Sequence, residues 1–360
     1  MTSSVFERVG VGARALEKLA DRPLKFMEVC GTHTVSIYRS GLRALLPAGF
    51  GLVSGPGCPV CVTSQGAIDT LVRLSGKEGV AIATYGDMVR VPGTSFSLAQ
   101  ARAQGASVHV VLSAAESLDL ARELRGKTVV FAGVGFETTA PATAAVILEA
   151  DRIRQDNFLV LNLHKTVPTV LRTLASDPKL GLDGFLLPGH VSTILGLEPY
   201  RALAADHGMP CVVAGFEPDQ IMAGLVLLAA QKATGRFSVQ SAYPQAVRAR
   251  GNERAKALLS QVFEESDAAW RGLGILPGSG LKIRDLYSRF DARACLGLDD
   301  PETPEPPGCR CGDVLAGRIA PAECPLFDGT CTPEEPVGPC MVSSEGSCAA
   351  AYRFGRRELP

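Results

Sequence analysis

Two short cysteine-bearing segments near the N-terminus contain residue types that bind metals or exchange disulfides. The first reads Phe26-Met-Glu-Val-Cys30-Gly-Thr-His33-Thr, and the second reads Ser54-Gly-Pro-Gly-Cys58-Pro-Val-Cys61. In each segment an apolar run predicts a strand, and the turn after it leads into a predicted helix. A helix N-terminus presents free N–H groups and a positive dipole end. The placement therefore favours thiolate, the form that binds iron or attacks a disulfide.

The same cysteines have a simpler interpretation as apolar core residues, since free cysteine is commonly buried. Cys58 and Cys61 fit that alternative poorly, because Gly-Pro-Gly-Cys-Pro is a poor core strand and a good rigid loop. Cys30 has no second thiol in its own motif, so a role as an apolar core residue is a stronger alternative for Cys30 than for the other two cysteines.

The totals limit the class of protein. A chain of 360 residues predicts two or three domains. Its 36 basic and 37 acidic residues nearly balance, so the chain has no positive electrostatic field that would attract nucleic acid or an anionic membrane. The longest apolar run, 221–230, is too short to span a bilayer, and the first residues do not resemble a signal peptide. We therefore expect a cytoplasmic protein, in which the 11 cysteines indicate metal or redox chemistry.

Predicted strands and helices alternate from residue 24 to residue 233, which favours parallel βαβ units. Three motifs of the first half recur in the same order in the second half: 26–34 in 131–139, 56–58 in 188–190, and 83–87 in 214–217.

The alternation of strands and helices and the recurrence of the three motifs together predict an α/β fold with two tandem parallel-sheet domains of similar topology. We expect the first domain at residues 1–125 and the second at 126–235. The remaining residues, 236–360, are expected to form a long helix near 245–270 and a cysteine-rich domain.

The distinctive turns all follow predicted strands, and ligands of parallel α/β sheets bind at the carboxyl ends of the strands. Two such edges facing each other would form a cleft. We expect its walls to carry Cys30, His33, Cys58, Cys61, Asp87, Glu137, His164 and His190. Each histidine has an alternative role as a hydrogen-bonded structural residue, and Glu137 has one as part of a helix cap.

Six of the 11 cysteines lie after residue 308: Cys309, Cys311, Cys324, Cys331, Cys340 and Cys348. Their spacing lacks the paired Cys-x-x-Cys knuckles of a zinc ribbon and the Cys-x-x-Cys-x-x-Cys run of bacterial ferredoxins. Six thiols in a Gly- and Pro-rich segment favour four ligands of an iron–sulfur cluster plus one extra pair. Zinc and structural or disulfide-bonded cysteines remain alternatives.

Taken together, these motifs resemble the HypD family of hydrogenase-maturation proteins, which help to build the iron centre of nickel–iron hydrogenases. The resemblance runs nearly end to end through Cys30-Gly-Thr-His-Thr, Gly55-Pro-Gly-Cys-Pro-Val-Cys61, Gly135-Phe-Glu-Thr-Thr139, Pro188-Gly-His-Val-Ser192, Pro277-Gly-Ser-Gly-Leu281, Cys309-x-Cys-Gly-Asp313 and Gly338-Pro-Cys-Met-Val-Ser-Ser-Glu-Gly346. It implies two related α/β domains and a third domain that carries a 4Fe-4S cluster.

The resemblance also implies roles for individual cysteines. The cluster ligands would be Cys309, Cys324, Cys331 and Cys348. Cys311 and Cys340 would then be a neighbouring redox pair, while Cys30, Cys58 and Cys61 would bind iron at the assembly site.

We expect His33, Glu137 and His190 to complete the site around that iron, where the two histidines would orient ligands or donate hydrogen bonds to cyanide. The resemblance further implies partners. The small protein HypC would share the iron, HypE would deliver cyanide, and the hydrogenase large subunit would later receive an iron bearing cyanide and carbon monoxide. A soft thiolate suits such an iron. The hypothesis is an electron relay from the cluster, directly or through the extra thiol pair, to the Cys-x-x-Cys motif.

Two other function classes compete with this hypothesis. A stand-alone thiol–disulfide oxidoreductase, in which the cluster reduces the Cys-x-x-Cys motif for a target protein, uses the same residues. Nucleotide hydrolysis has little support, because the chain lacks both a Gly-x-x-x-x-Gly-Lys-Ser/Thr loop and a Gly-x-Gly-x-x-Gly motif. No turnover of a small substrate is evident, so enzyme status in the usual sense is left open.

Overall fold

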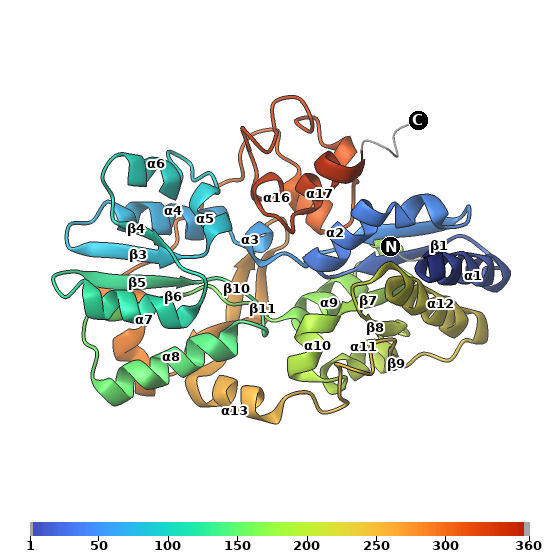
Figure 1. Ribbon diagram of the computed structural model, residues 1–360, viewed down its shortest axis with the longest axis horizontal. Helices are drawn as coiled ribbons and strands as arrows, with labels where there is room; N and C mark the ends of the chain where they lie inside the picture. Colours follow the sequence, from blue (N-terminus) through green and yellow to red (C-terminus); the bar gives the residue numbers. More distant parts are fainter. Residues whose placement is uncertain (1–2, 356–360) are drawn as a thin grey trace.

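Two parallel sheets form the centre of the computed structural model, which describes residues 3–355 (Figure 1). The first sheet has the order β2-β1-β7-β8-β9, and its strands are β1 (Leu24–Glu28), β2 (Phe50–Ser54), β7 (Gly184–Pro188), β8 (Cys211–Ala214) and β9 (Val239–Ser241). The second has the order β4-β3-β5-β6, and its strands are β3 (Val80–Thr84), β4 (Val108–Val110), β5 (Thr128–Gly133) and β6 (Phe158–Asn162).

The two sheets have the same topology. Counted within each sheet, the first strand lies between the second and the third, and the fourth lies beyond the third. The strand order therefore reverses between β1 and β7 in one sheet and between β3 and β5 in the other. In open parallel sheets ligands bind at this point of reversal, the topological switch point. The predicted fold class, with two parallel-sheet α/β units of similar topology, is confirmed.

The predicted boundary between residues 125 and 126 is wrong, because it falls inside one sheet. Strands β3 and β4 lie before it, yet β3 pairs with β5, which lies after it. The first sheet is completed only when β7 returns to pair with β1. The periodicity of a sequence identifies strands without identifying their neighbours, so the interleaving was not visible in it.

Helices cover both faces of each sheet (Figure 1). Those of the first unit are α1 (Ser3–Leu19), α2 (Gly31–Ser40), α10 (Gly189–Leu195), α11 (Arg201–Asp206) and α12 (Pro218–Thr234). Those of the second are α4 (Gln65–Ser75), α5 (Gly86–Arg90), α6 (Leu98–Ala103), α7 (Ala114–Glu123) and α8 (Ala140–Ile153). Two connections between the units contain α3 (Pro59–Val62) and α9 (Val167–Ala175). Side chains such as Phe26 and Phe131 are buried in these layers, and each such burial contributes about 1.5–3 kcal/mol.

An antiparallel hairpin lies between the two units (Figure 1). It consists of β10 (Phe263–Trp270) and β11 (Gly274–Ile283) and follows α13 (Glu253–Val262). The long helix predicted near 245–270 is therefore wrong. Alternate residues of β10 are more exposed, as in a strand with one covered face, and pairing with the distant β11 determines its conformation.

The C-terminal segment forms a small cysteine-rich module above α2 and α3 in Figure 1. Its helices are short: α15 (Cys311–Leu315), α16 (Pro339–Val342) and α17 (Ser347–Phe354). Another short helix, α14 (Ala292–Leu296), precedes the module. Long irregular loops join them. Within residues 3–355, no helix is long and apolar enough to cross a bilayer.

Candidate functional site

A cleft of about 720 Å³ lies where the carboxyl ends of the two sheets meet. Its wall contains Cys30 after β1, His190 after β7, Asp87 after β3 and Gly135 after β5. These four strands are the ones at the two switch points. A larger cavity of about 910 Å³ near the start of β3 contains no cysteine or histidine. We therefore place the candidate site in the cleft.

Cys30 is the N-cap residue of α2 and is only 6% exposed. Burial raises the pKa of its thiol to about 12, with smaller contributions from the carboxylates of Glu345 and Glu28. The expectation of a free thiolate at this helix N-terminus is therefore wrong for the protein without a bound cation. A metal ion displaces the proton of a coordinating thiol, so this sulfur becomes an anionic ligand only when a metal is bound.

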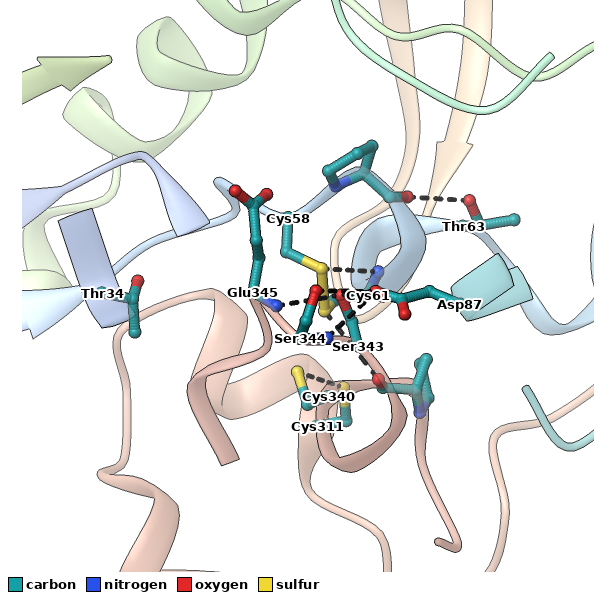
Figure 2. Close-up of a disulfide and its surroundings, with 12 residues drawn as sticks. Thr34, Cys58, Cys61, Thr63, Asp87, Cys311, Cys340, Ser343, Ser344 and Glu345 are labelled. Atoms are coloured by element: carbon teal, nitrogen blue, oxygen red, sulfur yellow. Dashed lines mark hydrogen bonds between the residues drawn. A yellow bond between two sulfur atoms is a disulfide. The ribbon is translucent and has the colours of Figure 1, made fainter. Parts of the chain in front are cut away.

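Cys58 and Cys61 form a disulfide next to this position (Figure 2). The turns after β1 and β2 are in direct contact, since the N–H of Gly31 donates to the carbonyl of Gly57 over 3.1 Å. A Cβ atom at Gly57 would lie 2.3 Å from the nitrogen of Cys30, so only glycine fits there. While the disulfide is intact its sulfurs are not thiolates, and binding of iron by this pair requires reduction.

The three candidate histidines have different surroundings, and only His190 lies in the cleft wall. Its ring stacks on Phe216, with 4.0 Å between the ring centroids. His33 is fully buried, its Nε2 lies 2.9 Å from the carbonyl oxygen of Gly215, and burial lowers its pKa to about 4. His33 thus holds the turn after β8, as in the structural alternative.

His164 and Glu137 are also absent from the cleft wall, contrary to expectation. His164 lines a separate cavity of about 310 Å³ beside the hairpin, and burial lowers its pKa to about 3. Glu137 is buried and accepts a hydrogen bond from the N–H of Val167 over 2.9 Å, so it caps α9. Both side chains are buried and point away from the cleft, and the sequence motifs do not encode this orientation.

All six C-terminal cysteines line one small enclosed cavity, together with Leu326, Phe327, Gly338 and Met341. The sulfur atoms of Cys311 and Cys340 are 2.9 Å apart. The N–H of Val337 donates to the sulfur of Cys331 over 3.3 Å. Burial raises the pKa of Cys309 to about 12. The Cys340 thiol and, less strongly, the guanidinium of Arg271 lower the pKa of Cys311.

This donor set fits an iron–sulfur cluster. The polar atoms of the cavity wall come from thiols, without carboxylate or imidazole, and soft sulfur ligands suit iron–sulfur clusters. Within residues 3–355, no three His, Cys, Asp or Glu side chains converge as they would around a single ion. A cluster does not require such convergence, because its cysteines bind different iron atoms. Zinc, which draws its ligands to one point, fits less well.

Two of the cysteines that line the cavity, Cys311 and Cys340, lie below the Cys58–Cys61 disulfide in Figure 2. The sulfur of Cys61 is 4.0 Å from the carbonyl oxygen of Pro339, the residue before Cys340. The Cys311 and Cys340 pair is therefore the part of the cavity wall nearest the Cys58–Cys61 disulfide in Figure 2, an arrangement that the sequence motifs did not reveal.

Comparison with known proteins places the chain in a family. The HypD family model, described as "Hydrogenase formation hypA family", matches residues 9–355. The chain belongs to the HypD family. It is 43% identical over 341 residues to "Hydrogenase maturation factor HypD" of Rhodobacter capsulatus, an alignment that covers 93% of this chain and 90% of the relative. It is 42% identical over 355 residues to the protein of the same name from Escherichia coli K12, covering 98% and 95%.

A third HypD relative, from Azotobacter vinelandii, is 43% identical over 350 residues and is likewise named a hydrogenase maturation factor. The family resemblance and the main predicted function, hydrogenase maturation, are thereby confirmed. The oxidoreductase alternative gains no support from these names.

In this HypD-family chain, two carboxylates bind the C-terminal module to the cleft, and the sequence motifs did not identify this role. Asp87 Oδ2 accepts hydrogen bonds from the hydroxyls of Ser343 and Ser344 and from the N–H of Ser344, at 3.0–3.1 Å (Figure 2). Thr32 donates to Glu345 over 2.6 Å, and Glu345 lies in the cleft wall. The segment Ser343–Glu345 thus connects both switch points. Its place in the longest C-terminal motif was the only sequence signal.

We expect Asp87→Ala to loosen this connection without unfolding the protein. Three hydrogen bonds to one carboxylate are lost at a partly exposed site, which costs about 1–2 kcal/mol. Hydrogen exchange should accelerate in residues 340–350. Asp69→Ala is the matched control. Asp69 is likewise a carboxylate that accepts hydrogen bonds, but its two donors are the N–H and the hydroxyl of Thr94, within its own unit. Equal exchange in both variants would contradict the bridging role.

Glu137 should make stability depend on pH. Burial raises its pKa from 4.5 to about 7, and its Oε2 has no hydrogen-bond partner among the described residues. The protonated form is therefore favoured on folding, and this contribution is lost as pH rises through about 7. We expect Glu137→Gln, which stays neutral, to gain up to about 3 kcal/mol over wild type between pH 5 and pH 8 in urea unfolding. A parallel pH dependence in both proteins would contradict the assignment, and exposed Glu149→Gln serves as control.

Proposed function

We propose that this chain is the scaffold on which the iron group of nickel–iron hydrogenase, an iron bearing cyanide and carbon monoxide, is assembled. The observation that carries the proposal is the junction of three sulfur sites. A buried cysteine lies in a cleft at both switch points, a disulfide lies beside it, and two cysteines of a sulfur-lined cavity lie below that disulfide in Figure 2. The iron is the cargo of this scaffold.

Cys30 is the proposed anchor of the iron. Its thiolate is a soft ligand, which suits low-spin iron with cyanide and carbonyl ligands. The sulfur releases its proton when iron binds, and the positive charge of the iron then compensates the thiolate beside the neighbouring Glu345 and Glu28. His190, held by its stack on Phe216, is positioned as a hydrogen-bond donor to a cyanide nitrogen.

The two cysteine pairs are the proposed electron stores. Reduction of the Cys58–Cys61 disulfide takes up two electrons and two protons and yields two thiols. Closure of a disulfide between Cys311 and Cys340 would release the same numbers, and their sulfur atoms are already in contact. Cys309, Cys324, Cys331 and Cys348 would hold a 4Fe-4S cluster in the cavity. When bound, this cluster would supply electrons singly.

The proposed partners are HypC, which would share the iron, and HypE, which would deliver cyanide. Membership of a maturation family implies partner proteins, and the rim of the cleft offers a surface for one. Leu112 lies in the cleft wall and is 86% exposed, and the neighbouring Val110 is also exposed. An exposed leucine at the mouth of a cleft offers apolar surface that a bound protein can remove from water.

The test is an infrared spectrum of the chain isolated without oxygen together with HypC and HypE. We expect cyanide and carbonyl stretching bands from iron bound to the complex. Their absence from a complex that contains iron would overturn the scaffold proposal and favour the oxidoreductase. Leu112→Asp should reduce co-purification of HypC, whereas Leu286→Asp, a similarly exposed leucine outside the cleft wall, should not.

A further inference from the structure

Arg271 is a buried cation at the turn between β10 and β11. It is 2% exposed, and within residues 3–355 no carboxylate lies within ion-pair distance of it. Its Nε donates to the carbonyl of Thr63 over 3.1 Å and its Nη2 to Oε1 of Gln65 over 3.2 Å, while its Nη1 has no acceptor in the part of the chain that the structure describes. Removing a cation from water costs several kcal/mol unless negative charge compensates it. The protein chain alone leaves this charge largely uncompensated.

The position of Arg271 is fixed from two sides. Its own N–H donates to the carbonyl of Val62, the residue after Cys61. Gly272, the next residue, packs backbone to backbone against Gly312, the residue after Cys311. A Cβ atom at Gly272 would lie only 2.1 Å from the Cα of Gly312. The backbone of this turn therefore lies between the disulfide helix α3 and the cavity helix α15, and the guanidinium is near enough to Cys311 to lower the pKa of that thiol.

One acidic group faces the same junction. Glu305 Oε1 would lie 3.2 Å from a Cβ atom at Gly312, and its side chain is only partly buried. Its charge opposes that of Arg271 at the cavity, but a partly exposed carboxylate is screened by solvent more strongly than a buried guanidinium. Arg271 is therefore the less screened of the two opposite charges at this side of the cavity.

We propose that Arg271 is the fixed counter-charge of the cysteine cavity, and that it makes a cluster bound there easier to reduce. The inference rests on the proposed 4Fe-4S cluster. Four thiolates bring negative charge into the cavity, and reduction adds one electron more. A nearby buried cation stabilises the reduced state more than the oxidised one and so raises the reduction potential. Arginine stays charged throughout, so no protonation step is involved.

A purely structural role for Arg271, as the hydrogen-bond partner of Thr63 and Gln65, is the competing explanation. Charge and hydrogen bonding are separated by two variants. Arg271→Lys keeps the charge and shortens the hydrogen-bonding group, whereas Arg271→Met keeps most of the apolar stem and removes the charge. Arg271→Gln, which keeps a donor for the Thr63 carbonyl, replaces the methionine variant if that variant does not fold. Arg310→Met is the matched control, because Arg310 follows Cys309 but is 51% exposed and paired with Asp313.

The experiment is a redox titration of the cluster in the full-length protein, purified without oxygen and monitored by electron paramagnetic resonance. Iron and sulfide are counted in every sample. In Arg271→Met we expect the equilibrium constant for cluster reduction to fall at least tenfold, a lowering of the midpoint potential by about 59 mV for one electron. Arg271→Lys and Arg310→Met should both stay within twofold of wild type.

Three results would overturn the inference in distinguishable ways. An unchanged potential in Arg271→Met excludes the counter-charge role. Equal shifts in the methionine and lysine variants show that hydrogen bonding or packing is responsible. A wild-type protein that contains no iron and sulfide refutes the proposed cluster itself, and this inference with it.

Discussion

Cys30→Ala is expected to abolish the cyanide and carbonyl infrared bands of iron on this chain and to stop hydrogenase maturation. The substitution removes one sulfur atom from a cleft wall and leaves the backbone hydrogen bonds of the turn in place. The fold, the Cys58–Cys61 disulfide and the cysteine cavity should therefore persist. The measurements are infrared spectroscopy of the complex, maturation in cells lacking their own family member, and thiol counting before and after reduction.

Cys211→Ala is the matched control for this experiment. Cys211 lies on β8 of the same unit, is fully buried and, like Cys30, has its pKa raised to about 12 by burial, but it lies outside the cleft wall. This variant should mature hydrogenase normally. Maturation that persists in Cys30→Ala would end the anchor assignment. If Cys30→Ala loses the cyanide and carbonyl bands of iron but still reduces the Cys58–Cys61 disulfide, the result supports the scaffold function over the oxidoreductase function.

Cys324→Ala and Cys340→Ala are expected to differ completely in cluster content. Both thiols line the same cavity, but Cys340 already contacts Cys311 through its sulfur. The alanine at 324 removes one of four proposed ligands, so iron and sulfide should be lost. The alanine at 340 should leave the cluster bound and impair electron transfer to the Cys58–Cys61 disulfide.

The difference can be measured by visible absorption and by counting iron and sulfide after purification without oxygen. Cluster loss in both variants would contradict the division into four ligands and one pair. Zinc without sulfide in the wild-type protein would refute the cluster for this cavity.

The sequence located those parts of the site that depend on local structure. Cys30 and Cys58 are N-cap residues, as predicted, because a strand, a turn and a helix follow one another within a few residues. The pairing of β1 with β7 depends on residues more than 150 positions apart, and no local pattern encodes it. For the same reason His33 was expected in the cleft wall, although the first turn of α2 directs its ring inward to Gly215.

The position of Cys30 at a helix N-terminus was predicted correctly, but the predicted thiolate state was wrong. A helix N-terminus stabilises an anion by about 0.3–1 kcal/mol. Burial and the nearby carboxylates raise the pKa of this thiol from 9.0 to about 12, which corresponds to about 4 kcal/mol. The cost of desolvation therefore exceeds the dipole effect severalfold. The burial of Cys30 results from tertiary packing around the turn after β1, and the charge of Glu345 comes from a residue distant in sequence.

The interleaved order of the strands has a consequence for biosynthesis. Strands β1 and β2 leave the ribosome first, but β7, which pairs with β1, begins only at Gly184. At typical elongation rates this delay is on the order of ten seconds. During that time the sheet formed by β3–β6 can complete itself, while Cys30, Cys58 and Cys61 remain on a nascent segment whose β1 and β2 strands still lack the rest of their sheet. These thiols are thus accessible to oxidants and stray metal ions before the cleft exists, and the nascent chain is a natural client for chaperones.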